Sequence, residues 1–278
     1  GYVIPKEGLY KSFESQKMHD KPIIFGSNRD EEKLFMVFDN YFVKRPLSFL
    51  SWIDSRLNFY IKPKDAQYYD IYAKYMTQST ILGATHLPAR FSSFQNSSHV
   101  YAYRFDWDEE PGDWSFLLGA GHAMELGFLF KTDAITDREK KSIAQLLYDT
   151  NKIETDILLS NEMGKYWINF ATDGNPNINP YVMSSKWLKW NSANNKERYL
   201  VLDTINDKGI VMYDAELSGP SILQGLESEN ISIEKKCYVI DSLFKRSGHG
   251  VIRTRTTLSE DEITCLLYTS PSPRDKRQ

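Results

Sequence analysis

The distribution of apolar and polar residues along the chain predicts strands and helices in alternation. Residues 21–26 form a short apolar run that ends in a glycine, a pattern typical of a buried strand. A polar segment at 27–32 follows, and residues 34–42 carry apolar side chains at helical spacing. A strand, a polar loop and a helix in succession predict one α/β unit.

The middle of the chain predicts helices on both sides of a second strand. Residues 46–95 are predicted to be mainly helical, with aromatic and aliphatic side chains that pack in a core. Residues 99–105 alternate in polarity and are rich in β-formers, so they predict a strand. In the segment 117–126 that follows, small residues surround a single histidine, His122.

A long helical pattern comes next. Thr136 and Glu139 have the spacing of a capping box, and apolar residues at helical intervals continue from Ile143 to Phe170. The turn-forming sequence at 173–176 is expected to end this helix.

The later part of the chain changes its pattern twice. Residues 187–213 contain short β-rich runs around turn-forming residues, which predict a small antiparallel β element. Four apolar residues then repeat at helical offsets and predict an amphipathic helix that Gly248 ends: Ile233, Cys237, Ile240 and Phe244. The predicted fold class is α/β, with sheet strands near 21–26 and 99–105, many helices, and the antiparallel element.

The end of the chain has no continuing pattern, and residues 251–278 are predicted to be disordered. The last segment, TCLLYTSPSPRDKRQ at 264–278, resembles translated adaptor or vector sequence and is interpreted as a non-native tail. A native disordered tail is the alternative.

Composition excludes some classes of function and leaves the compartment open. The 278 residues carry 34 Lys and Arg against 37 Asp and Glu, a formal charge of −3, so no basic field is available to bind nucleic acid. No stretch approaches the roughly 18 consecutive apolar residues of a membrane span. The two cysteines, Cys237 and Cys265, lack metal-ligand spacing, and we expect neither a metal site nor a disulfide.

Two polar loops follow the predicted strands, and each carries a residue of interest. Glu31 lies after the first strand and His122 after the second, and functional groups of open α/β sheets gather at the carboxyl ends of strands. A carboxylate beside an imidazole fixes its tautomer and stabilises the imidazolium formed during proton transfer. Taken alone, such a histidine is more often structural, and an acidic loop after a strand is usually only solvated.

Three segments in order resemble the type-B carboxylesterases and cholinesterases. KPIIFGSNRDEEKLF at 21–35 is similar to the strand and loop that deliver the acidic triad residue of that family. HVYAYRFDWDEE at 99–110, followed by LLGAGHAMELGFLF at 117–130, resembles the strand and loop of the catalytic histidine. GKYWINFATDGNPN at 164–177 is similar to a late helix of the family.

The resemblance implies that residues 1–250 are the C-terminal portion of a single α/β-hydrolase domain. It places the triad acid on Glu31 and the general base on His122, and implies a small carboxylic ester as substrate with no cofactor. The family often has glycine after the acid, whereas Glu32 follows here, so Asp30 and Glu32 remain alternatives for the acid.

The nucleophile of an α/β-hydrolase sits in a Gly-x-Ser-x-Gly elbow, and no such pentapeptide occurs in the 278 residues. An HGGG-type oxyanion segment is also missing. We therefore expect a fragment that begins between the serine and the acid and is inactive alone. The alternatives are a cholinesterase-like binding or adhesion protein without catalysis, and a fragment with no function of its own.

Overall fold

The computed structural model describes residues 6, 21–50, 53, 60–95, 99–132, 147–178, 184–191, 194, 196–215 and 217–246. All structural statements below concern these residues. The predicted tail at 251–278, the capping box at Thr136 and Glu139, and Gly248 lie outside them.

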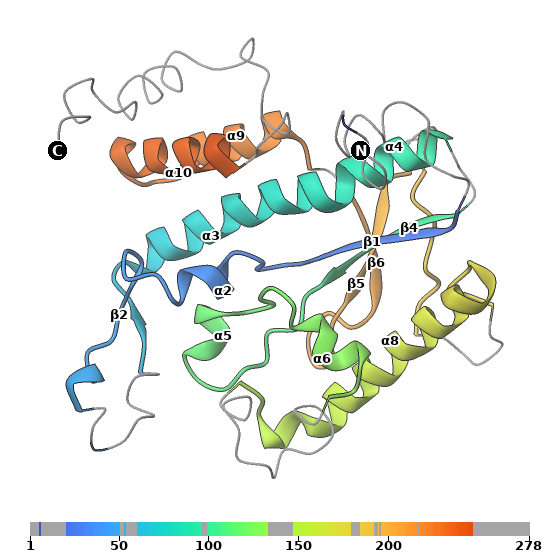
Figure 1. Cartoon of the computed structure of the whole chain (residues 1–278), viewed down its shortest axis with the longest axis horizontal. Coiled ribbons are helices and arrows are strands. Elements are labelled where there is room, and N and C mark those ends of the chain that lie inside the picture. The colour runs from blue at the N-terminus through green and yellow to red at the C-terminus, as the bar shows by residue number, and fades with distance from the viewer. Residues whose placement is uncertain are drawn as a thin grey trace.

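A mixed four-stranded sheet with the order β1-β4-β5-β6 forms the centre of the described structure (Figure 1). Its strands are β1 (Ile23–Asn28), β4 (Val100–Phe105), β5 (Arg198–Leu202) and β6 (Val211–Asp214). β1 pairs in parallel with β4, and β4 pairs in parallel with β5. Together with the helices around this sheet, the two strands expected near 21–26 and 99–105 confirm the predicted α/β class.

The antiparallel element predicted near 187–213 exists as the β5–β6 pair, but it is not separate from the main sheet. Arg104 and Val201 are register partners in the parallel β4–β5 ladder, so β5 belongs to both pairings. The local sequence pattern predicts that β5 forms a strand, but it does not show that β4 pairs with its second edge.

One layer of helices covers one side of the sheet (Figure 1). It contains α3 (Ala66–Ile81), the π-helical turn η3 (Leu82–His86), α4 (Leu87–Gln95), α9 (Gly219–Ser228) and α10 (Ile233–Arg246). The Asp65 carboxylate caps α3 by accepting from the backbone N–H of Tyr68 at 2.9 Å. Buried side chains of α3, α9 and α10 share one hydrophobic core, which confirms the predicted amphipathic helix α10.

A second group of helices lies on the opposite side (Figure 1). It contains α5 (Trp114–Leu117), α6 (Glu125–Leu129), the short 3-10 helix η5 (Thr150–Lys152) and α8 (Ile153–Asp173). Tyr101 and Phe105 of β4 share a core with α8, whereas Val100 and Ala102 pack with α4. Alternate side chains of this central strand therefore support the two layers. Gly174, with φ of 68°, ends α8 as the sequence predicts.

Two predicted helical regions are shorter than expected. The helix expected at 34–42 is only α2 (Lys33–Met36). Beyond its end the Asp39 carboxylate accepts from the backbone N–H of Tyr41 at 2.7 Å and forms a turn. Residues 46–65 are not mainly helical where described. They contain the 3-10 helix η1 (Ser48–Leu50) and part of a small antiparallel pair, β2 (Val43–Lys44) with β3 (Lys62–Pro63).

The expectation of no disulfide is wrong, because Cys237 of α10 is disulfide-bonded. Cys265 lies outside the described residues. Motif spacing along the chain predicts zinc and redox sites, whereas a disulfide depends on distance in the fold.

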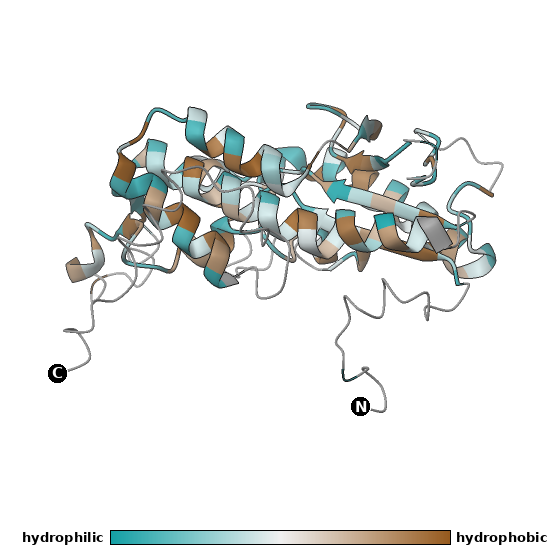
Figure 2. Ribbon diagram, turned by 90° about the horizontal axis from the view of Figure 1, so that it is seen from above, coloured by the Kyte–Doolittle hydropathy of each residue, from teal (hydrophilic) through white to brown (hydrophobic). Residues whose placement is uncertain are grey.

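The helices carry both apolar and polar residues along their length (Figure 2). Within the described ranges, no helix has both the length and the apolar character required to cross a bilayer.

Candidate active site

The acid loop, residues 29–32, begins where β1 ends. The backbone N–H of Arg29 donates to Phe105 O at 2.9 Å, which extends the β1–β4 ladder to the first residue of the loop. The chain then turns, and the backbone N–H of Asn28 donates to Glu31 Oε1 at 2.7 Å. This bond points the Glu31 carboxylate back across the end of the strand. Its side chain is only 12% exposed.

The histidine loop, residues 119–124, lies at the same edge of the sheet. Gly119 and Ala123 both have positive φ, 51° and 66°, so the backbone is tightly turned around His122. The imidazole is 52% exposed, and its ring centroid lies 5.4 Å from that of Phe35. His122 is therefore half-exposed and lies beside an aromatic ring.

The structure brings the two predicted site residues together, although 91 positions separate them. His122 Nδ1 lies 2.6 Å from Glu31 Oε2. Because a carboxylate accepts, Nδ1 carries the proton in this contact, and a neutral imidazole then has Nε2 free to accept one. The contact arises because β1 and β4 are parallel neighbours, so the loops after them meet at one edge.

The other two acids of the loop have different surroundings. Asp30 lies between two cations, 2.9 Å from Arg29 Nη2 and 3.2 Å from Lys33 Nζ. Glu32 is buried, and its backbone N–H donates to Thr77 Oγ1 of α3 at 3.1 Å. The structure therefore pairs His122 with Glu31 among the three consecutive candidates.

A second group of acids at the ends of β4 and β5 has no counterpart in the sequence analysis. Glu109, Glu110 and Asp203 are all buried. Burial raises the pKa of Glu110 to about 9 and the pKa values of Glu109 and Asp203 to about 7. The Thr204 hydroxyl donates to Glu109, whereas both oxygens of Glu110 have no hydrogen-bond partner among the described residues. Nothing in the sequence distinguishes these buried acids from acidic residues that are exposed to solvent.

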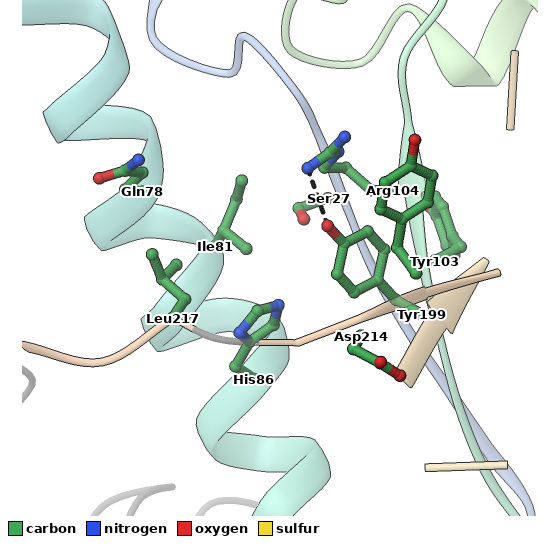
Figure 3. Close-up of a pocket in the computed structure, with 10 residues that line it drawn as sticks. Ser27, Gln78, Ile81, His86, Tyr103, Arg104, Tyr199, Asp214 and Leu217 are labelled. Atoms are coloured by element: carbon green, nitrogen blue, oxygen red, sulfur yellow. Dashed lines mark hydrogen bonds between the residues drawn. The ribbon is translucent and has the colours of Figure 1, made fainter. Parts of the chain in front are cut away.

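A cavity of about 520 Å³ lies between α3, η3 and the sheet (Figure 3). Ser27, His86 and Arg104 contribute polar groups to its wall, and Arg104 Nη1 donates to Tyr199 Oη at 3.0 Å. Burial and nearby arginines lower the pKa of His86 to about 3, so this imidazole is neutral.

This cavity is separate from the Glu31–His122 pair. Ser27 and Asn28 are consecutive in β1, so their side chains point to opposite faces, and that of Asn28 reaches the histidine loop. Neither Glu31 nor His122 is among the residues that line it.

In the part of the chain that the structure describes, no group of three His, Cys, Asp or Glu residues is arranged to hold a metal ion.

Comparison with known proteins gives consistent matches. A sequence model described as the carboxylesterase family matches residues 1–216. Acetylcholinesterase of Danio rerio is 27% identical over 118 residues, which cover 42% of this chain and 17% of that protein. Carboxylesterase 4A of Bos taurus is 31% identical over 100 residues, which cover 36% of this chain and 15% of that protein.

Solved esterase structures also match over most of this chain. A PNB esterase structure is 20% identical, covers 73% of this chain and 38% of that chain, and gives a TM-score of 0.49. EstA of Aspergillus niger is 18% identical and covers 78% of this chain and 40% of that chain, with a TM-score of 0.49. The chain thus spans less than half the length of these proteins.

Proposed function

This chain belongs to the carboxylesterase family, and we propose that Glu31 and His122 are the acid and the general base of a serine-esterase triad. The observation that carries the proposal is the 2.6 Å contact between Glu31 Oε2 and His122 Nδ1 at the carboxyl ends of two parallel strands. Family membership supports a carboxylic ester hydrolase that acts on small-molecule esters.

In the proposed mechanism His122 Nε2 accepts the proton of a serine hydroxyl as the serine oxygen attacks the ester carbonyl. Glu31 keeps the proton on Nδ1 and stabilises the imidazolium that forms. The imidazolium then protonates the leaving alcohol. Water then attacks the acyl-enzyme in the same two steps and releases the carboxylic acid. The proposed mechanism uses no cofactor. The exposed side of the His122 ring is the side that a serine and an ester can approach.

We propose that the serine and the oxyanion hole are contributed by residues outside this sequence, because the 278 residues contain no Gly-x-Ser-x-Gly. The sheet supports this proposal. β1 is an edge strand among the described residues, paired only with β4, and its apolar residues Ile23, Ile24 and Phe25 are half-buried rather than buried. Residues 1–250 are then the C-terminal portion of one α/β-hydrolase domain.

Hydrolysis of a p-nitrophenyl ester by the purified 278-residue chain tests the proposal that the serine is missing. We expect no turnover above that of a matched His122→Ala sample, because the covalent route requires the nucleophile. Turnover that His122→Ala abolishes would show that a nucleophile is present within these residues, and would overturn this part of the proposal.

The roles of Glu31 and His122 are tested in the complete enzyme that carries the serine. Full activity of His122→Ala or of Glu31→Gln there would reject the role of the residue that was changed. A complete protein whose elbow lacks serine and which hydrolyses no ester would contradict the esterase function as a whole.

A further inference from the structure

We propose that Asn28 is a positioning residue that holds the acid loop and the histidine loop at the separation that the Glu31–His122 contact requires. This inference rests on the proposed function, because it concerns the geometry of the same pair. Asn28 is the last residue of β1, and only 1% of it is exposed.

Asn28 bonds to both sides of the pair. Its backbone N–H donates to Glu31 Oε1 at 2.7 Å, so it holds the acid directly. Its side-chain Nδ2 donates to Gly121 O, the residue before His122, at 2.6 Å. The same Nδ2 donates to Glu125 Oε2, three residues after His122, also at 2.6 Å. One buried side chain therefore bonds to the backbone just before the imidazole and to a carboxylate side chain just after it.

The orientation of the Asn28 amide follows from its partners. A carbonyl oxygen and a carboxylate oxygen both accept hydrogen bonds, so the atom between them must be the amide nitrogen, and both of its protons are used. The amide oxygen Oδ1 is buried and has no partner among the described residues. The amide therefore donates both of its protons to the histidine loop and the residue that follows it.

Aspartate or leucine at position 28 would not supply the two hydrogen-bond donors of this arrangement. Aspartate at position 28 would place acceptor oxygens against Gly121 O and the Glu125 carboxylate, and leucine would donate nothing. The backbone bond from residue 28 to Glu31 would survive either change. Only the link to the histidine loop would be lost. An experiment can therefore distinguish the contribution of the Asn28 side chain from that of its backbone N–H.

A second link confirms that the two loops are in close contact. The backbone N–H of Asp30 donates to Ala120 O at 2.9 Å, and the backbone N–H of Ala120 donates to Asp30 Oδ2 at 3.2 Å. A Cβ atom at Gly119 would lie 2.5 Å from Asp30 Oδ2, so the loops approach as closely as glycine permits. The Asp30 link precedes His122, and the Asn28 link extends to Glu125 beyond it.

The test compares Asn28→Ala with Asn169→Ala in the 278-residue chain. Asn169 is a matched control because it is also buried and its Nδ2 donates to a backbone carbonyl, Pro176 O, at 3.1 Å. The signal measured is the Nδ1 proton of His122 in ¹H NMR spectra, assigned by its loss in His122→Gln. A hydrogen bond to a carboxylate moves this proton downfield and slows its exchange with water.

We expect the downfield proton in the unsubstituted chain and in Asn169→Ala, and its loss to exchange or an upfield shift in Asn28→Ala. A wild-type signal in Asn28→Ala, with a fall in melting temperature like that of Asn169→Ala, would overturn the inference and leave Asn28 a purely structural residue. Absence of the downfield proton from the unsubstituted chain would also overturn it.

If Asn28→Ala does not fold, Glu125→Ala provides the test. It removes one of the two acceptors of the Asn28 side-chain amide, and position 125 is partly exposed. Faster exchange of the His122 proton than in the unsubstituted chain supports the inference, and an unchanged exchange rate overturns it. An unchanged His122 signal in Asn28→Ala overturns the positioning role and leaves the esterase proposal standing, whereas absence of the signal from the unsubstituted chain counts against both.

Discussion

Two acidic triplets lie at the same edge of the sheet, and one glutamate in each has surroundings opposite to those of the other. Residues 30–32 follow β1, and residues 108–110 follow β4. In the first, Glu31 accepts from a backbone N–H and from His122. In the second, Glu110 is 4% exposed and neither of its oxygens has a partner among the described residues. Partners in a half-open site give an oriented carboxylate, whereas burial without partners favours the protonated acid.

The largest expected difference between the triplets is in catalysis. On the proposed triad mechanism, Glu31→Gln in the complete protein should lower kcat about 10⁴-fold, because the amide would not hold His122 in the required tautomer. Glu109→Gln makes the same chemical change in the second triplet and should leave kcat unchanged. Hydrolysis of p-nitrophenyl esters by both variants measures the effect. Equal losses of kcat would remove the distinction between the two triplets.

The next effect concerns stability and its pH dependence. The pKa of Glu110 is raised to about 9 in the folded chain, against 4.5 for the free side chain. Between these values the unfolded chain has lost a proton that the folded chain keeps, so the contribution of Glu110 to stability is greatest below pH 4.5 and falls as the pH rises towards 9. The slope is about 1.4 kcal/mol per pH unit.

Glu110→Gln should therefore stabilise the chain by about 3 kcal/mol at pH 7 and flatten the decline in stability between pH 5 and pH 9. Urea unfolding over this pH range measures the change. Glu227→Gln, on an exposed position of α9, is the control and should have no such effect. An unchanged pH slope in Glu110→Gln would contradict the protonated, buried state of this acid.

A smaller effect is expected from the backbone of the histidine loop. Ala123 has φ of 66°, which strains an L-residue with a Cβ atom, so Ala123→Gly should stabilise the chain by about 1 kcal/mol. Ala102→Gly, in the extended strand β4, should instead destabilise it by about 1 kcal/mol. Chemical denaturation distinguishes the signs, and destabilisation by both substitutions would show that Ala123 is not strained.

The smallest effect concerns Arg29, which connects the two triplets. Its Nη2 lies 2.9 Å from Asp30 Oδ2 and 2.7 Å from Asp108 Oδ2, and the side chains are partly exposed. Asp108→Asn should cost about 0.5 kcal/mol in dilute salt and less in 1 M NaCl, because salt partly screens a pair that is partly exposed. Urea unfolding at the two salt concentrations measures it, and a loss that persists in high salt would indicate a desolvated pair.

Local periodicity along the chain is enough to specify several of its elements. The strands β1 and β4, the helix α10 and the stop of α8 at Gly174 follow from apolar spacing and from a glycine that tolerates positive φ. The resemblance of three segments to one family, together with the position of Glu31 and His122 after strands, was sufficient to select this pair for the proposed site.

Which groups meet and which are buried depends on the folded chain. It paired His122 with Glu31 rather than with Asp30 or Glu32, placed Glu110 in the interior, and joined β5 to the parallel sheet. The two acidic runs are alike in sequence, because periodicity records the local preference of a backbone segment. Burial and partner choice depend on contacts between segments many residues apart, and these contacts exist only once the sheet and its helices have packed.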